Sequence, residues 1–77
     1  MRVVIENLPN DISEEGVREA LNSFGQVGTV KLIKEGAAPA VLVEVGSRGQ
    51  ADALVRRING RFYKGREIRA WVPLWND

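Results

Sequence analysis

The apolar residues of this 77-residue chain alternate with a two-residue period in short segments and recur with a helical period in two longer ones. The order along the chain is strand, helix, strand, strand, helix, strand, and no linker or repeat interrupts it. Because each helix has one apolar stripe, both helices must cover the same face of a sheet. With right-handed crossovers, this order predicts an α+β, ferredoxin-like βαββαβ fold whose four-stranded antiparallel sheet has its first and third strands in the centre.

Both predicted helices begin with capping signals. Ser13 is expected to cap a first helix over about residues 14–24, which ends at Gly25. Ser47 and Gln50 have the spacing of a capping box, in which each side chain accepts a hydrogen bond from the backbone N–H group of the other residue. We therefore expect the second helix to begin directly after Ser47.

The length suits a single domain over residues 1–77, with a core of about residues 2–73 and a short C-terminal tail. The chain has no Cys and no His, which excludes thiol nucleophiles, imidazole acid–base chemistry, disulfides and most zinc sites. No segment approaches the roughly 20 apolar residues of a membrane span. We expect a protein without enzymatic activity, cofactor, metal or membrane contact, located in the cytoplasm.

Charge is distributed unevenly along the chain, although the net charge is only +1. Residues 1–46 contain four basic and seven acidic side chains, whereas residues 47–77 contain seven basic and three acidic ones. Clustered Lys and Arg attract phosphate groups, so the second half can contribute to nucleic-acid binding. The alternative is that most of these arginines cover a solvated helix and turn.

Several segments have the order and spacing of one known family: Val3-Val4-Ile5-Glu6-Asn7-Leu8, Ser13-Glu14-Glu15, Ser23-Phe24-Gly25, and Leu54 to Gly60 followed by Gly65 to Arg69. In these segments, from Arg2 to about Val72, the chain resembles an RNA recognition motif. The resemblance implies that single-stranded RNA lies across the open face of the sheet, with its bases stacked on aromatic rings of the two central strands.

The aromatic rings of that family are missing from the central strands. Val4 stands where the short ribonucleoprotein submotif usually has an aromatic residue, and Ala40 and Leu42 occupy the stacking positions of the long submotif. Stacking of a base on an aromatic ring is worth about 1–3 kcal/mol. RNA binding through this sheet is therefore expected to be weak.

Trp71 is the candidate replacement for the missing rings. It is expected on the open face of the last strand beside Arg2 and Arg69, where it would stack a base while the arginines bind phosphate. The alternative is that Trp71 covers the sheet edge or packs against Trp75.

Two further residues have open alternatives: Lys31 can bind a phosphate or protect an edge strand, and Asn7 can bond to RNA or form a turn. The predicted RNA-binding residues are Arg2, Val4, Asn7, Lys31, Ala40, Leu42, Arg69 and Trp71. Alternatively, the same apolar face binds a protein partner or a second copy of the chain. Phe24, Phe62 and Tyr63 are expected to pack in the core or on its flank.

Overall fold

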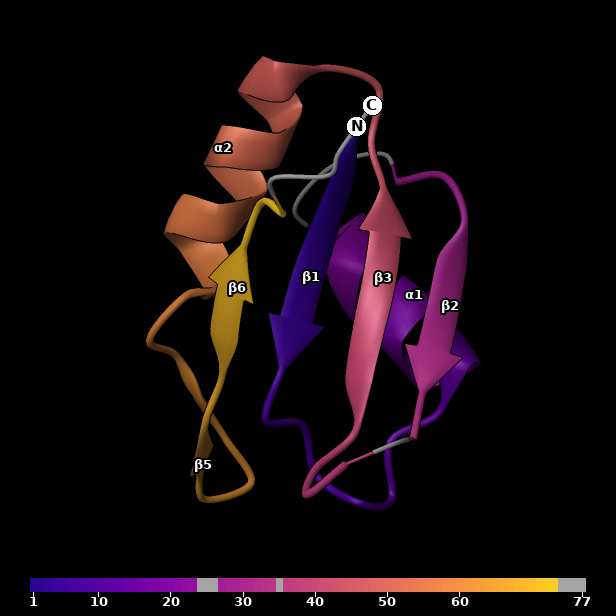
Figure 1. Cartoon of the computed structure of the whole chain (residues 1–77), viewed down its shortest axis with the longest axis vertical. Helices are drawn as coiled ribbons and strands as arrows, with labels where there is room; N and C mark the ends of the chain where they lie inside the picture. Colours follow the sequence, from indigo (N-terminus) through magenta and orange to yellow (C-terminus); the bar gives the residue numbers. More distant parts are fainter. Residues whose placement is uncertain (24–26, 35, 74–77) are drawn as a thin grey trace.

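In the computed structural model, which describes residues 1–23, 27–34 and 36–73, a four-stranded antiparallel sheet forms one layer and two helices form the other (Figure 1). The order of strands across the sheet is β2-β3-β1-β6. The elements are β1 Arg2–Glu6, α1 Glu14–Asn22, β2 Val30–Ile33, β3 Ala40–Glu44, α2 Arg48–Ile58 and β6 Arg69–Trp71. The ferredoxin-like fold is confirmed, with β1 and β3 in the centre.

Helix α1 begins at its predicted cap. Ser13 has an extended backbone, and its Oγ accepts a hydrogen bond from the Gly16 N–H at 3.1 Å. The helix ends at Asn22. Its predicted end at Phe24 and Gly25 lies outside the described residues, as does the predicted packing of Phe24.

Helix α2 also begins as predicted, although its capping box is only half formed. Ser47 Oγ accepts a hydrogen bond from the Gln50 N–H at 3.2 Å. The Gln50 side chain does not return this bond to Ser47, because its Oε1 accepts from the Gly46 N–H at 2.8 Å. The Gln50 side chain therefore bonds to the N–H of Gly46, one residue before the expected N–H of Ser47.

The core lies between the sheet and the helices, and the predicted alternation along the strands determines which side chains enter it. In β3, Val41 and Val43 are fully buried, whereas Ala40 and Leu42 lie half-buried on the opposite, open face. The helices contribute their apolar stripes to the same core, namely Val17, Leu21, Ala51, Leu54 and Ile58. The open face therefore carries the side chains that the helices leave uncovered.

At each edge of the sheet, a side chain accepts a hydrogen bond from an outward-facing backbone N–H group. The Leu32 N–H of β2 donates to Glu14 Oε2 at 2.9 Å, and the Ala70 N–H of β6 donates to Asn59 Oδ1 at 3.1 Å. Open N–H groups of edge strands can pair with another chain. These two bonds reduce that tendency, so strand-to-strand association at the edges is disfavoured.

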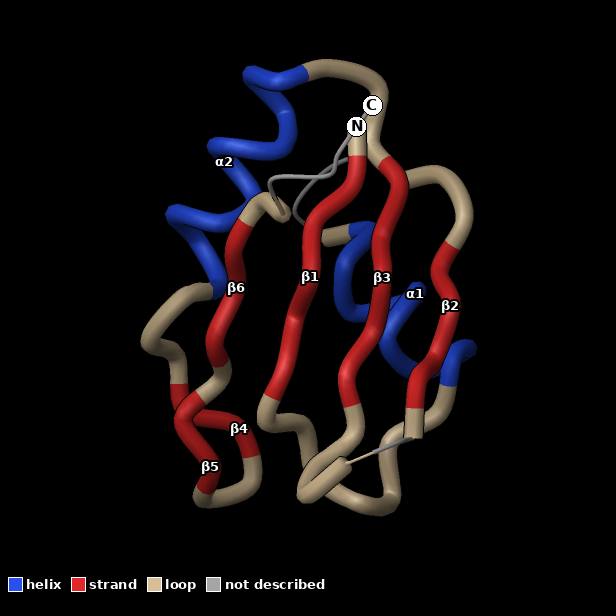
Figure 2. The backbone as a smooth tube through the Cα atoms, viewed as in Figure 1, coloured by secondary structure: helices blue, strands red, loops and turns tan. Residues whose placement is uncertain are grey.

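Residues 62–67 form a short hairpin that the sequence patterns did not predict. Strand β4 (Phe62–Tyr63) pairs with β5 (Arg66–Glu67), and Lys64 and Gly65 between them have φ values of 51° and 82°, as in a type I′ turn. The hairpin lies beyond the N-terminal end of β6, at the bottom of the view (Figure 2). Phe62 is consequently 73% exposed and Tyr63 46% exposed, so these two rings do not lie in the core, and of the two predicted places only the flank of the core remains.

Candidate nucleic-acid interface

A row of four predicted site residues crosses the open face of the sheet. The register pairs Lys31 of β2 with Leu42 of β3, Leu42 with Val4 of β1, and Val4 with Trp71 of β6. Side chains of directly opposed residues lie on the same face, with their Cβ atoms about 5 Å apart. The fold therefore brings a cation, two aliphatic side chains and an indole ring into one line.

Val4 lies in the middle of this row and is nearly covered. It is 8% exposed although it does not belong to the core beneath the helices. Its cross-strand neighbours are Leu42 and Trp71, and Trp71 itself is 43% exposed. The indole thus lies next to an apolar surface and still presents area to solvent.

Trp71 also lies at the edge of the sheet. Together with Val55, Arg56 and Asn59 it lines a groove between β6 and α2. The structure therefore places Trp71 where it can partly cover the sheet edge and also flank the row. Trp75, the predicted alternative partner of the indole, lies outside the described residues.

A hollow of about 260 Å³ lies on the open face at the other end of the row. The predicted residues Arg2, Lys31 and Leu42 line it together with Thr29 and Glu44. Thr29 was not among the predicted site residues, although its alternation with Lys31 places it on this face. Two cationic side chains beside an apolar floor can hold a phosphate group next to a base.

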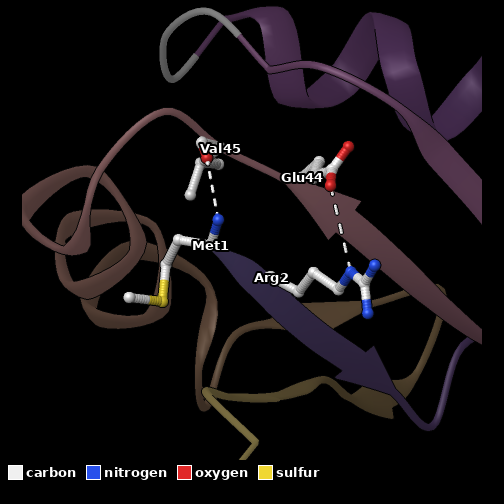
Figure 3. Close-up of polar contacts among 4 residues, drawn as sticks. All are labelled: Met1, Arg2, Glu44 and Val45. Atoms are coloured by element: carbon white, nitrogen blue, oxygen red, sulfur yellow. Dashed lines mark hydrogen bonds and ion pairs between the residues drawn. The ribbon is translucent and has the colours of Figure 1, made fainter. Parts of the chain in front are cut away.

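Arg2 is held at this hollow by its cross-strand partner Glu44. Arg2 Nε lies 3.9 Å from Glu44 Oε2, and both side chains are about half exposed (Figure 3). An exposed ion pair of this kind contributes only about 0–1 kcal/mol. A phosphate group can therefore compete for Arg2 at little cost.

The same corner of the sheet is closed by backbone hydrogen bonds. The Val45 N–H donates to the Met1 carbonyl at 2.9 Å, and the Met1 nitrogen lies 3.4 Å from the Val45 carbonyl (Figure 3). These bonds continue the pairing of β1 with β3 beyond Arg2 and fix the backbone beneath the hollow.

The second row of the open face combines apolar and charged residues. Ala40 is half-buried and pairs with Ile33, whereas Arg69 is exposed and pairs with Glu6. The cross-strand position of Arg69 offsets the negative charge that Glu6 brings to the face. Arg69 is thus placed next to the row that ends at Trp71.

Asn7 lies just beyond β1 and connects that strand to the hairpin. Its φ is 65°, its Nδ2 donates to the Glu67 carbonyl at 2.8 Å, and its Oδ1 accepts from Arg66 Nη2 at 2.8 Å. The positive φ is typical of a turn residue, whereas the side-chain bonds reach the hairpin across the fold. A contact of Asn7 with RNA stays a prediction.

Two negative findings apply to the described part of the chain. No helix there is both long and apolar enough to cross a bilayer. In the same residues, acidic side chains do not gather in groups of three or more that could hold a metal ion.

Comparison with known proteins agrees with the fold. The family model described as RNA recognition motif matches residues 3–69. A Caenorhabditis elegans protein named "Probable splicing factor, arginine/serine-rich 3" is 35% identical over 69 residues, which are 88% of this chain and 26% of that protein. The chain thus spans about a quarter of the length of this curated relative.

Solved structures give the same result. The C. elegans NONO-1 homodimer has a TM-score of 0.80 at 25% identity, covering 95% of this chain and 28% of that one. A structure of the Rna15 RRM with bound RNA (GU) has a TM-score of 0.84 at 19% identity, covering 99% of this chain and 85% of that one. The second likeness concerns the fold alone.

Proposed function

The chain belongs to the RNA recognition motif family, and from this premise we propose that it binds single-stranded RNA through the open face of its sheet. The observation that carries the proposal is the row of Lys31, Leu42, Val4 and Trp71 across all strands of the sheet. Cations at one end and an indole at the other supply the two interactions that hold single strands, phosphate pairing and base stacking.

Each part of the face has a defined task in this binding mode. Trp71 stacks one base at the outer strand, where Arg69 on the same strand is close enough to bind the adjoining phosphate. Arg2 and Lys31 bind a second phosphate at the hollow, and Leu42 forms the apolar floor beneath the nucleotide. The aliphatic centre of the row contacts bases without stacking them strongly.

The absence of aromatic residues from the centre makes the binding weak. Two or three missing rings, at the positions of Val4, Ala40 and Leu42, remove about 2–9 kcal/mol of stacking. A micromolar complex has a total binding free energy of only about 8 kcal/mol. We therefore expect dissociation constants above the micromolar range for short single strands.

Substitution of Trp71 tests the proposal directly. Trp71→Ala is expected to weaken RNA binding about 5- to 150-fold, because one stacked base contributes about 1–3 kcal/mol. The measurement is a titration of mixed-sequence single-stranded RNA oligonucleotides, followed by fluorescence anisotropy. Phe62→Ala is the matched control, since it removes an exposed ring outside the sheet and should leave the affinity unchanged. If the Trp71→Ala variant is folded and binds RNA as tightly as the natural chain, Trp71 does not stack a base.

Salt dependence separates RNA binding from an apolar protein contact. If Arg69 neutralises one phosphate, and Arg2 together with Lys31 neutralises a second, the slope of log affinity against log salt is about −1.4. Raising the salt from about 50 mM to about 200 mM should therefore weaken binding about sevenfold. A salt-independent affinity would contradict phosphate contacts by these three side chains.

Self-association through the open face is the second candidate function. It is favoured by the apolar centre of the row and by the 25% identity to a structure that is named as a homodimer. Such a contact would use the face rather than the edges, where Glu14 and Asn59 occupy N–H groups. Sedimentation at increasing protein concentration distinguishes a self-associating chain from a monomer that binds RNA.

The cytoplasmic location and the lack of enzymatic activity stay predictions.

A further inference from the structure

An apolar groove lies on the helix side of the molecule, outside the proposed RNA-binding face. It has a volume of about 280 Å³ and runs between α1, the end of α2 and the hairpin of β4 and β5. We call it the helix-side groove. The lining residues that matter here are Ile12, Gly16, Ala20, Ile58, Phe62 and Tyr63.

Exposed aromatic rings stand at the border of this groove. Among the described residues, the exposed large hydrophobic side chains are Phe62, Tyr63 and Trp71. Trp71 belongs to the open face of the sheet, but the other two line the helix-side groove. Aromatic residues that remain exposed beside an apolar concavity are typical of interaction sites, because they carry large binding energies when covered.

The hairpin holds these rings in place before any partner binds. Lys64 Nζ lies 2.9 Å from Asp11 Oδ2 and 5.5 Å from the centre of the Tyr63 ring. The hydrogen bond between Lys64 and Asp11, with the attraction of their charges, lowers the pKa of the Asp11 carboxyl and raises the pKa of the Lys64 ammonium. The bonds of Arg66 to Asn7 fix the other strand of the hairpin. A surface ordered in advance loses less entropy on binding.

Size limits the occupant of the groove to one large side chain. A cavity of about 150 Å³ in a protein core is enough to bind a benzene molecule. The helix-side groove, at about 280 Å³, accommodates the side chain of a Trp, Phe or Leu residue together with part of its backbone. It is too small for a folded domain or for several stacked bases.

Charge defines the surroundings of that side chain. Successive residues of a helix are about 100° apart, so Glu15 and Glu19 lie beside Gly16 and Ala20, on the side away from the buried Val17 and Leu21. Both carboxylates are exposed. They attract cations and repel phosphate, which disfavours RNA as the occupant.

Arg61 provides the opposite charge on the other wall of the groove. A bound chain is therefore expected to direct its basic residues toward α1 and away from Arg61. Lys64 does not change this polarity, because Asp11 pairs with it.

We propose that the helix-side groove binds a basic peptide segment of a partner protein, which inserts one large apolar side chain between α1 and the aromatic rings of the hairpin. This site is separate from the open face of the sheet. The protein can therefore hold a peptide and an RNA strand at the same time, and the proposal does not depend on RNA binding.

The test uses four synthetic nine-residue peptides and ¹⁵N NMR of the whole chain. Two peptides have lysines on both sides of a central residue, which is Trp in one and Leu in the other. The third peptide has the same lysines around a central Ala, and the fourth has glutamates around a central Trp. At least one of the first two should shift the amide signals of Gly16, Ala20 and Phe62, while the other two peptides shift them weakly. Absence of these shifts with both lysine peptides, or equal shifts with the Ala peptide, would overturn the proposal.

Variants identify the groove as the place of binding. Phe62→Ala removes a ring, and Ala20→Gln fills the groove from an exposed helical position, so each should weaken the peptide at least about tenfold. Trp71→Ala should leave peptide binding unchanged. A single-stranded RNA that shifts the groove amides in place of the peptide would assign this surface to nucleic acid and contradict the proposal.

Discussion

Val4→Tyr combined with Leu42→Phe is expected to tighten single-stranded RNA binding by about 2–6 kcal/mol, since each new ring can stack one base. The two positions are direct cross-strand partners on the open face, between Lys31 and Trp71. The new rings would therefore extend the platform that Trp71 provides at the outer strand. Titration of the same RNA oligonucleotides into both proteins measures the gain.

The gain should depend on the place of the rings and not on added apolar surface. Ala53→Phe adds a ring at an exposed position of α2, on the other side of the molecule, and should leave RNA affinity unchanged. Each single variant should give part of the gain, and neighbouring rings need not contribute additively. If the folded double variant binds RNA no better than the natural chain, missing rings are not what limits affinity.

The arrangement of the sheet face could be predicted from the sequence because it depends on local periodicity. Alternation along β3 is enough to separate the buried Val41 and Val43 from Ala40 and Leu42. The βαββαβ order then places β1 beside β3, which brings Val4 opposite Leu42. Strand-period patterns and one topological rule thus define most of the candidate interface.

The hairpin could not be predicted in this way because its strands contain only two residues each. Two residues show no period, and the turn uses Lys64-Gly65 in place of the common Asn-Gly pair. The exposure of Phe62 follows from this hairpin. Of the two predicted places for this ring, the core and its flank, the core is therefore wrong.

Side chains that bond across the fold were also beyond sequence reasoning. Asn7 and Asn59 each follow a regular element, and the local sequence indicates neither partner: for Asn7 it leaves a turn or a bond to RNA open. In the structure Asn7 bonds to residues 66 and 67, and Asn59 occupies the N–H of Ala70. Such partners depend on the distance between segments that are far apart in the chain, which no local pattern contains.

Leu54→Ala is expected to lower the free energy of unfolding by about 2–5 kcal/mol, because it leaves a cavity where a large buried side chain packed. Leu54 is 6% exposed and belongs to the apolar stripe with which α2 covers the sheet. A domain of 77 residues has a total stability of only about 4–12 kcal/mol, so this loss is a large share of it. Urea denaturation followed by circular dichroism measures the change.

Val55→Ala is the matched control for this cavity. Val55 is the next residue of the same helix but only half-buried, so its truncation should cost clearly less than that of Leu54. If both variants lose the same free energy of unfolding, the core is not centred on the apolar stripe of α2. Helix α2 packs against β1 and β6, the strands that carry Val4 and Trp71. Under conditions where Leu54→Ala remains folded, its RNA affinity should match that of the natural chain, because the row on the open face does not contain Leu54.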